Sequence, residues 1–323
     1  MGAYVHRTGG QQRCGRLWFS HPQPMTQDPE GWAIQGRAQA DSRPAERVQP
    51  LVTIITPCLN AVETISETLM SVVQAQAVLQ KDHWELEHIL IDGGSTDGTE
   101  AVVARHAARY GFCRWISNIT GGPYAAMNVG LQQAGGRYAH VLNSDDLLLD
   151  PGAYAAFLQA GHRSKARVLL ASIGYFRRPD RQLRSLWQVE PIPASAAEWR
   201  RQLAAGLHYP HPGFIADLET YRQQSFDETY SLSADYKLMQ SILLTQPPEP
   251  PPMVCQHPLV AMAEGGATGN WKAVLQGWRQ LGAINQELGI EASGIRRYWR
   301  KLKQRLRPLP QPILIPHLEV PES

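Results

Sequence analysis

The strongest constraint on the fold is a regular alternation between short apolar runs rich in β-branched residues and longer segments with helical periodicity. Strands that alternate with helices form βαβ units, and the strands of such units lie parallel to one another. The runs that predict strands cover residues 51–56, 87–91, 113–116 and 138–142, and the helical segments between them cover 64–76, 99–109 and 124–134. This pattern predicts an α/β fold with a mainly parallel central sheet.

Turn and cap residues indicate where several of these elements begin and end. Pro57 is expected to end the first strand, and Thr64-x-x-Glu67 resembles a capping box at the start of the first helix. Asp150-Pro151 is a favourable N-cap and first-turn pair for a helix after the fourth strand. Beyond Val168 the elements shorten, as in an α+β half. The later segments are a helix ending near Leu244, a strand at 259–262, and helices at 271–288 and 292–307.

Composition limits the class of protein. The 323 residues are 43% hydrophobic, which is enough for a packed core, and 31 basic against 29 acidic residues leave a net charge of +2. A near-neutral chain is a poor candidate for a nucleic-acid binder with a basic surface, so no nucleic-acid partner is expected. We predict a flexible N-terminal extension at 1–49, one catalytic domain at 50–268, and a C-terminal helical extension with a Pro-rich tail at 269–323.

The cysteines and the apolar segments indicate a cytoplasmic protein. Four cysteines lie far apart, with no CxxC pair and no Cys/His group at zinc-finger spacing, so neither a disulfide framework nor a zinc site is expected. No apolar run reaches the roughly 20 residues of a membrane span, and no signal peptide is recognised.

Three polar clusters follow predicted strands: Thr56-Pro-Cys-Leu-Asn60, Asp92-Gly-Gly-Ser-Thr-Asp-Gly98 and Asn143-Ser-Asp-Asp146. Each alone could be an ordinary turn, but ligands of open parallel sheets bind at the carboxyl ends of strands. The adjacent Asp145 and Asp146 would repel each other unless a cation lies between them, and a hard divalent ion suits two carboxylates. The chain has no P-loop and no GxGxxG motif, which disfavours Walker ATPases and dinucleotide dehydrogenases.

These residues carry a resemblance to the family 2 glycosyltransferases, which are inverting enzymes with the GT-A fold. Segments 53–60, 89–99 and 141–147 are similar to the three signatures of the family, in the form used in bacterial polysaccharide assembly. Tyr124-Ala-Ala-Met-Asn128 resembles its Tyr-Asp-Ala-Met-Asn element, and Ser233-Ala-Asp-Tyr-Lys-Leu238 its Ala-Asp-Tyr-Asp-Leu element. The match runs in order from about residue 51 to 268.

The resemblance implies roles for particular residues. Asp92 would accept a hydrogen bond from the nucleotide base, Asp145 would coordinate Mg²⁺ or Mn²⁺ on the donor diphosphate, and Asp146 would support the metal or contact the sugar. The residues that the resemblance places at the nucleotide or donor sugar are Thr56, Pro57, Asn60, Asp92, Gly94, Ser95, Asn128, Ser144 and Asp146. The donor would be UDP- or GDP-linked, and the acceptor a saccharide or lipid-linked saccharide.

Asp235 is the candidate general base. Inversion by single displacement needs a base that removes the proton of the acceptor hydroxyl as it attacks the anomeric carbon, and a positioned carboxylate can do this. The alternative is that Asp235 caps the helix that follows Ser233. His208 and His211 could reach the acceptor, although a packed loop histidine is the commoner situation.

This chain departs from the resembled subgroup before Tyr124. The subgroup commonly has Asp-Lys-Gly where this chain has Thr120-Gly-Gly-Pro123, and Ala125 replaces an Asp. Two charged contacts to the substrates are therefore absent. This leaves open a catalytically silent nucleotide-sugar-binding protein; a nucleotidyltransferase is disfavoured because no Gly-rich basic loop follows the first strand.

The predicted helix at 292–307 is strongly basic. Seven Arg and Lys accompany one acid between residues 291 and 307, whereas residues 51–290 hold 18 basic and 22 acidic groups. Ile295, Tyr298, Trp299, Leu302 and Leu306 form one apolar stripe. Such a helix suits either the surface of an anionic membrane or packing against the domain. Binding of this helix to an anionic membrane would place the protein at the inner face of the membrane.

Overall fold

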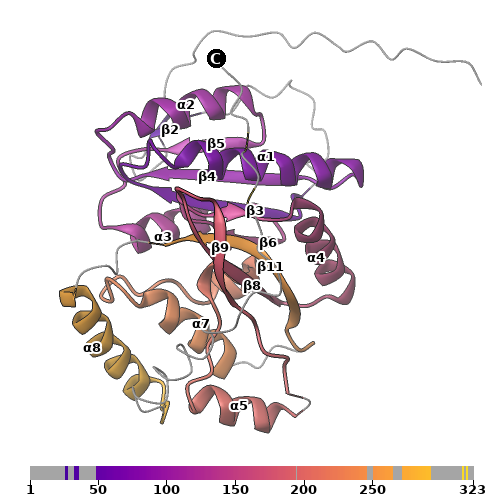
Figure 1. Ribbon diagram of the computed structural model, residues 1–323, viewed down its shortest axis with the longest axis vertical. Helices are drawn as coiled ribbons and strands as arrows, with labels where there is room; N and C mark the ends of the chain where they lie inside the picture. The colour runs from indigo at the N-terminus through magenta and orange to yellow at the C-terminus, as the bar shows by residue number, and fades with distance from the viewer. Residues whose placement is uncertain are drawn as a thin grey trace, which may run out of the picture.

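The central feature of the fold is one twisted sheet (Figure 1). The computed structural model describes residues 26–27, 33–35, 49–193, 195–245, 250–264, 271–291, 315 and 318. The sheet order is β1-β2-β5-β4-β3-β6-β10-β8-β11-β7, with β9 paired to β8. The strands are β1 (Thr26–Gln27), β2 (Ala33–Gln35), β3 (Val52–Cys58), β4 (Leu86–Asp92), β5 (Cys113–Ile116), β6 (Tyr138–Val141), β7 (Leu147–Leu148), β8 (Val168–Arg177), β9 (Gln182–Trp187), β10 (Phe214–Asp217) and β11 (Met253–Ala263).

Most helices lie close to predicted places, but the two short helices at 196–204 and 218–222 were not predicted individually. The helices are α1 (Ile65–Lys81), α2 (Thr99–Arg109), α3 (Pro123–Gln133), α4 (Pro151–Ser164), α5 (Ala196–Ala204), α6 (Leu218–Arg222), α7 (Ala234–Thr245) and α8 (Trp271–Glu287), with a 3-10 turn η1 (His211–Gly213). Asp150 caps α4 as expected, since its carboxylate accepts a hydrogen bond from Ala153 N at 2.9 Å. The strands β5, β4, β3 and β6 pair in parallel, which confirms the predicted α/β architecture.

The first strand continues past Pro57, whereas the sequence predicts that it ends there. β3 continues to Cys58 and pairs with β4 as far as Cys58 and Asp92. On its other side β3 pairs with β6 only as far as Ile55 and Val141, and Ile55 O accepts the bond from Leu142 N. Because N–H groups alternate in direction along a strand, Pro57 N faces this side, beyond the last pair. Its missing N–H therefore costs no ladder bond.

The predicted capping box is also wrong. The Thr64 hydroxyl donates to the carbonyl oxygens of Ser144 at 2.9 Å and Ala61 at 3.3 Å, and no side chain caps α1. Glu67 pairs instead with two arginines, Arg178 and Arg181. α1 also runs beyond Gln76 to Lys81, because its apolar face continues to pack against the sheet through Leu79.

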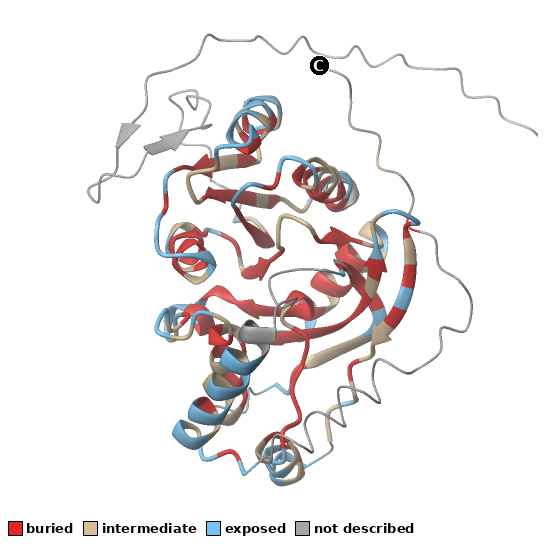
Figure 2. Ribbon diagram, turned by 60° about the vertical axis from the view of Figure 1, so that its left-hand side comes forward, coloured by how far each residue is buried: buried red, intermediate tan, exposed pale blue. Residues whose placement is uncertain are grey.

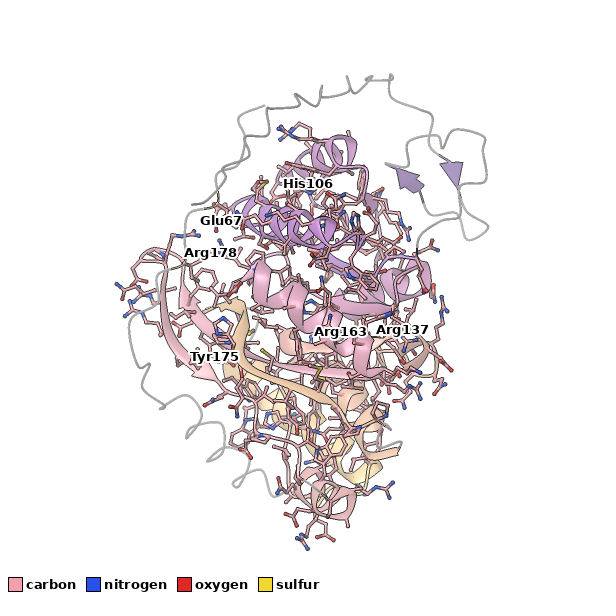
Figure 3. All side chains as sticks on the ribbon, turned by 90° about the vertical axis from the view of Figure 1, so that its right-hand side faces the viewer. Glu67, His106, Arg137, Arg163, Tyr175 and Arg178 are labelled. Carbon is pink, nitrogen blue, oxygen red and sulfur yellow. The ribbon has the colours of Figure 1, made fainter. Side chains whose placement is uncertain are left out.

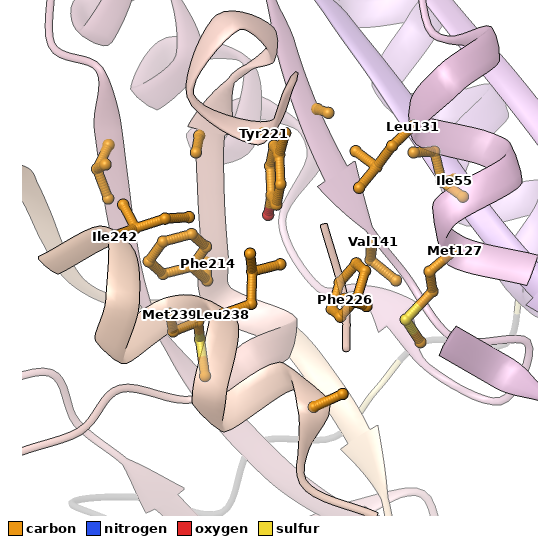
Figure 4. Close-up of a cluster of buried hydrophobic side chains, with 14 of the residues drawn as sticks. Ile55, Met127, Leu131, Val141, Phe214, Tyr221, Phe226, Leu238, Met239 and Ile242 are labelled. Atoms are coloured by element: carbon orange, nitrogen blue, oxygen red, sulfur yellow. The ribbon is translucent and has the colours of Figure 1, made fainter. Parts of the chain in front are cut away.

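Helices cover both faces of the parallel part of the sheet. Leu90 of β4 packs with α1 and α2, whereas its neighbours Ile89 and Ile91 pack on the opposite face with α3 and α7. This second face holds a large apolar cluster that joins the two halves of the chain (Figure 4). The alternation of side-chain direction along β4 thus explains why a continuous apolar run is needed there.

The second half of the chain extends the sheet with mixed pairing. β10 is antiparallel to β6 and β8, and β11 is parallel to β8. β11 begins at Met253, earlier than the predicted 259–262, because a bulge around Pro258 lets one long strand follow β8. Gly213 passes so close to β8 that an added Cβ would lie 2.1 Å from Ala171 O. Buried strands and exposed outer helix faces are contrasted in Figure 2.

The two predicted extensions lie mostly outside the described residues. This holds for most of 1–49 and for the basic helix at 292–307, so the predicted membrane contact remains a prediction. In the described part of the chain, no helix combines the length and the apolar character needed to cross a bilayer. Ile315 is buried beside β9, and its backbone N donates to Arg181 O at 2.9 Å.

The buried His140 of β6 makes folding stability depend on pH. Its Nε2 lies 2.9 Å from Pro212 O and must carry the proton, because a carbonyl only accepts; Nδ1 then accepts from Tyr154 Oη at 2.9 Å. Burial lowers the pKa of His140 to about 4. Since the unfolded side chain titrates near 6.5, its contribution is complete above about pH 6.5 and is lost as the pH falls toward 4.

We therefore expect His140→Gln to show a smaller loss of unfolding free energy than the wild-type chain between pH 7 and pH 4.5. Urea unfolding at several pH values measures this difference. An unchanged pH slope in the variant would contradict the assignment.

Candidate active site

The three polar loops meet at one edge of the sheet. β3, β4 and β6 are parallel neighbours, so the loops that follow Cys58, Asp92 and Val141 leave the sheet at the same end. α3 also begins here, because it follows the parallel strand β5, and Ile119 N in the connecting loop donates to Asp92 O at 3.0 Å. The grouping expected from the sequence is therefore present.

Asp92 organises the loop that follows it. Its buried carboxylate accepts hydrogen bonds from Gly94 N at 2.9 Å, Ser95 N at 3.0 Å and Ser95 Oγ at 2.5 Å. Gly94 has φ +89°, a conformation that a side chain would strain. A carboxylate held in this way has a fixed direction, which a hydrogen bond to a planar base requires.

Hydrogen bonds between side chains and backbone join the first loop to the second. Asn60 Oδ1 accepts from Thr96 N at 2.9 Å, and Asn60 N donates to Ser95 Oγ at 2.9 Å. Asp97 accepts from Val62 N at 3.0 Å. The two loops therefore form one surface, on which the Leu59 side chain is 58% exposed. Thr56 and Pro57 precede the first loop and belong to β3. The Thr56 hydroxyl oxygen lies 3.0 Å from His88 Nε2.

The two adjacent carboxylates differ in exposure. Asp146 is buried, with Oδ1 accepting from Ala263 N at 3.2 Å and Oδ2 from Asn143 Nδ2 at 3.0 Å. Asp145 is partly exposed. Burial, with the charge of Asp145, raises the pKa of Asp146 to about 8, and burial also raises the pKa of Asp145. A bound divalent cation would favour the ionised form of both carboxyl groups, whose pKa values are raised without it. This pair of oxygen donors therefore fits Mg²⁺ or Mn²⁺.

An arginine that the sequence did not single out lies against this pair. Arg178 follows β8; its Nη2 donates to the Asp145 carbonyl at 2.6 Å and its Nη1 to Glu67 Oε2 at 2.7 Å (Figure 3). Arg181 donates to the other oxygen of Glu67. Thr64, the residue before α1, donates its hydroxyl to the neighbouring Ser144 carbonyl. These contacts join residues more than 30 positions apart, so local sequence patterns cannot reveal them.

Asp235 lies at the same edge of the sheet. It stands in the first turn of α7, and Tyr124 Oη, at the start of α3, donates to its Oδ1 at 3.0 Å. Burial raises the pKa of Tyr124, so the phenol keeps its proton and remains a donor. In the described residues the Asp235 carboxylate accepts its hydrogen bond from Tyr124 and not from the first turn of α7, which does not support the alternative capping role.

Aromatic side chains surround this aspartate. Tyr124 stacks on Phe226 with ring centroids 5.6 Å apart, and His211 meets the edge of the same ring at 5.7 Å. The Asp235 charge raises the pKa of His211, but burial lowers it more strongly. His208 is a packed loop histidine: it is buried, lies 5.0 Å from the Trp187 ring, and its Nδ1 is 3.2 Å from Gly206 O.

Asn128 binds another part of the chain. Its Oδ1 accepts from Phe226 N at 2.9 Å, and its Nδ2 donates to Phe226 O at 3.0 Å and to Glu228 Oε1 at 2.7 Å. These bonds hold the segment before α7 against α3. A donor contact by Asn128 would have to be made in addition to these bonds, so the predicted role remains a prediction.

Comparison with known proteins agrees with this geometry. The family model described as glycosyl transferase family 2 matches residues 53–229, more than half of the chain. The chain belongs to glycosyl transferase family 2. It is therefore a glycosyltransferase, as the resemblance implied, and the match includes all three polar loops but ends before Asp235.

Individual relatives extend the comparison. An uncharacterized glycosyltransferase of Mycobacterium tuberculosis, Rv1514c, is 29% identical over 201 residues, which cover 61% of this chain and 71% of the relative. TuaG of Bacillus subtilis, a putative teichuronic acid biosynthesis glycosyltransferase, is 36% identical over 101 residues, which cover 30% of this chain and 37% of TuaG.

Solved structures show the same fold at low identity. The crystal structure of S. aureus TarS 1–349 in complex with UDP-GlcNAc has a TM-score of 0.55 and 17% identity, and the match covers 76% of this chain and 69% of TarS. Mannosyltransferase PcManGT from Pyrobaculum calidifontis, in complex with GDP-Man and Mn²⁺, has a TM-score of 0.50 and 17% identity, covering 78% of this chain and 72% of its own. The GT-A fold is confirmed.

The ion pairs of Glu67 should contribute measurably to stability. We expect Arg178→Ala to lower the free energy of unfolding by roughly 1 to 3 kcal/mol, because it removes two charge-assisted hydrogen bonds that are partly shielded from water. Arg184→Ala is the matched control: it removes an exposed pair with Asp180 beside the same β8–β9 turn and should cost less than about 0.5 kcal/mol. Urea denaturation compares them; equal losses would contradict the assigned role of Arg178.

Proposed function

We propose that this family 2 glycosyltransferase is an inverting, metal-dependent enzyme that transfers a sugar from a UDP- or GDP-linked donor to the hydroxyl of a saccharide or lipid-linked saccharide. The observation that carries the proposal is the meeting of two kinds of carboxylate at one edge of the sheet. Asp145 is partly exposed beside the rigid Asp92 loop, and Asp235 is held at the same edge by Tyr124.

The donor would lie across the loops that follow β3, β4 and β6. Asp92, whose direction is fixed by its own loop, would accept a bond from the base, and the exposed Leu59 offers an apolar surface for it. TarS and PcManGT, which share the fold, were solved with UDP-GlcNAc and GDP-Man, and this supports a nucleotide-sugar donor of either base.

Asp145, with Asp146 behind it, would hold Mg²⁺ or Mn²⁺ on the donor diphosphate. When bound, such an ion neutralises charge that develops on the leaving nucleoside diphosphate. Arg178, fixed by Glu67 and by the Asp145 carbonyl, adds positive charge beside the same loop and favours an anionic ligand there.

Asp235 would act as the base. As the acceptor oxygen forms a bond to the anomeric carbon, the bond from that carbon to the phosphate oxygen breaks, and Asp235 receives the hydroxyl proton. Attack on the side opposite the leaving group inverts the configuration. The Tyr124 phenol, which stays protonated, orients the carboxylate and leaves Oδ2 for the acceptor.

TuaG is named for teichuronic acid biosynthesis, and this supports a saccharide acceptor for the present chain. A lipid-linked acceptor and a cytoplasmic site at the membrane surface rest on the basic segment 292–307, which lies outside the described residues. The competing function is a silent nucleotide-sugar binder of the same fold.

Donor binding can be tested without knowledge of the sugar. We expect UDP or GDP with Mn²⁺ to raise the melting temperature, neither component alone to do so as strongly, and Asp145→Asn to remove the joint effect. Thermal-shift measurements with each nucleotide, with and without Mn²⁺, provide the test. Asp82→Asn, at an exposed position at the far end of α1, is the control. If no nucleotide shifts the wild-type chain, the proposed donor class is wrong.

Turnover separates the enzyme from the silent binder. Asp235→Asn should keep the nucleotide-dependent thermal shift but lose about 10²- to 10⁴-fold in the rate of donor turnover, the contribution expected of a general base. Release of nucleoside diphosphate with saccharide acceptors measures the rate. Undiminished turnover in the variant would exclude Asp235 as the base, and a lost thermal shift would make its role structural.

A further inference from the structure

A second group of metal-ligating side chains lies away from the carboxylates. His88 of β4, His106 of α2 and Cys113 of β5 are all buried, and one ligand atom from each lies within 4.8 Å of the others. α2, which carries His106, packs on β4 and β5, the strands that carry His88 and Cys113 (Figure 1). Sequence spacing did not indicate it, because the three residues come from three separate elements.

The orientation of His88 favours a metal ligand. Its Nε2 is 3.0 Å from Thr56 Oγ1, and its Nδ1 is 3.9 Å from Cys113 Sγ. With the proton on Nε2 and donated to the threonine hydroxyl, the lone pair of Nδ1 faces the thiol. Metal-bound histidines usually have their second ring nitrogen fixed by such an outer hydrogen bond.

His106 provides an unsatisfied buried atom. Its side chain is 9% exposed, and Nε2 has no hydrogen-bond partner among the described residues. Buried polar atoms nearly always have a partner. Desolvation lowers the pKa of His88, and it lowers that of His106 to about 4, so both rings are neutral and can offer a lone pair. The His106 ring makes a tilted contact with the Tyr110 ring at 4.6 Å and a T-shaped contact with the His88 ring at 6.4 Å.

We propose that His88, His106 and Cys113 bind one Zn²⁺ ion. Two imidazoles and a thiolate suit zinc, whereas Mg²⁺ and Mn²⁺ prefer the oxygen ligands of Asp145 and Asp146. Binding would release the proton of the Cys113 thiol, because only the thiolate is a ligand. The ion would join α2, β4 and β5, and through Thr56 also β3.

The test uses Co²⁺ as a spectroscopic probe for the Zn²⁺ site. The full chain, stripped of metal under reducing conditions, is titrated with Co²⁺ in a Cys14→Ser, Cys255→Ser background, which leaves Cys58 and Cys113 as thiols. We expect one equivalent to give a thiolate-to-cobalt charge-transfer band that Zn²⁺ abolishes and Mn²⁺ does not. Zn²⁺ should also raise the melting temperature.

Variants assign the site. Cys113→Ala should lose the charge-transfer band, and His106→Gln should weaken binding at least tenfold. Cys58→Ala and Asp145→Asn should keep both the band and the affinity. Circular dichroism of the metal-free variants checks that they are folded, and the titration of the Cys14→Ser, Cys255→Ser chain stands even if a further variant does not fold. Absence of stoichiometric binding in that chain, or a band that persists in Cys113→Ala, would overturn the proposal.

Discussion

The candidate site depends on the unequal pairing of β3 with its two neighbours. β3 remains bonded to β4 as far as Cys58 and Asp92, but β6 leaves it after Ile55 and Val141. The last part of β3 therefore has one bonded side and one open side. Pro57 can occupy the open side without losing a hydrogen bond, and the chain from Leu142 to Asp146 is released to turn across the sheet edge.

The second constraint is the neutralisation of charge around Asp145. Two adjacent carboxyls and Glu67 would repel one another in a partly dry loop, and the guanidinium groups of Arg178 and Arg181 offset that charge from the β8–β9 turn. Each ion of a partly buried pair loses hydration, and this cost offsets much of the Coulomb attraction between the two charges. What the pairs provide here is a fixed position for the Asp145 backbone.

Much of the first half was predictable because its signals are local. Buried parallel strands need continuous β-branched runs, and α2 and β5 have the predicted bounds. The polar loops were predictable because strand ends in a parallel sheet share an edge. The capping box predicted at Thr64 and Glu67 was wrong. Their spacing matches the motif, but their side chains bind Ser144, Arg178 and Arg181, which are distant in the sequence. Tertiary contacts overrode a local preference there.

The proposed base, Asp235, and the buried His88–His106–Cys113 group illustrate the limits of spacing arguments. Asp235 was found only through resemblance, since its partner Tyr124 is 111 positions earlier. Cysteine and histidine spacing detects metal sites built on one short segment, and it cannot detect a group assembled from a strand, a helix and a second strand.

The contacts of α3 bear on how proteins of this architecture can diverge. Tyr124 and Asn128 belong by sequence to the nucleotide-side half, yet they hold Asp235, Phe226 and Glu228 of the other half. A chimera that exchanges the second half with that of a relative, cut at the loop before β8, would separate these partners. The second half and one face of α3 would therefore have to be exchanged together. A single cut before β8 would lose the hydrogen bonds between them.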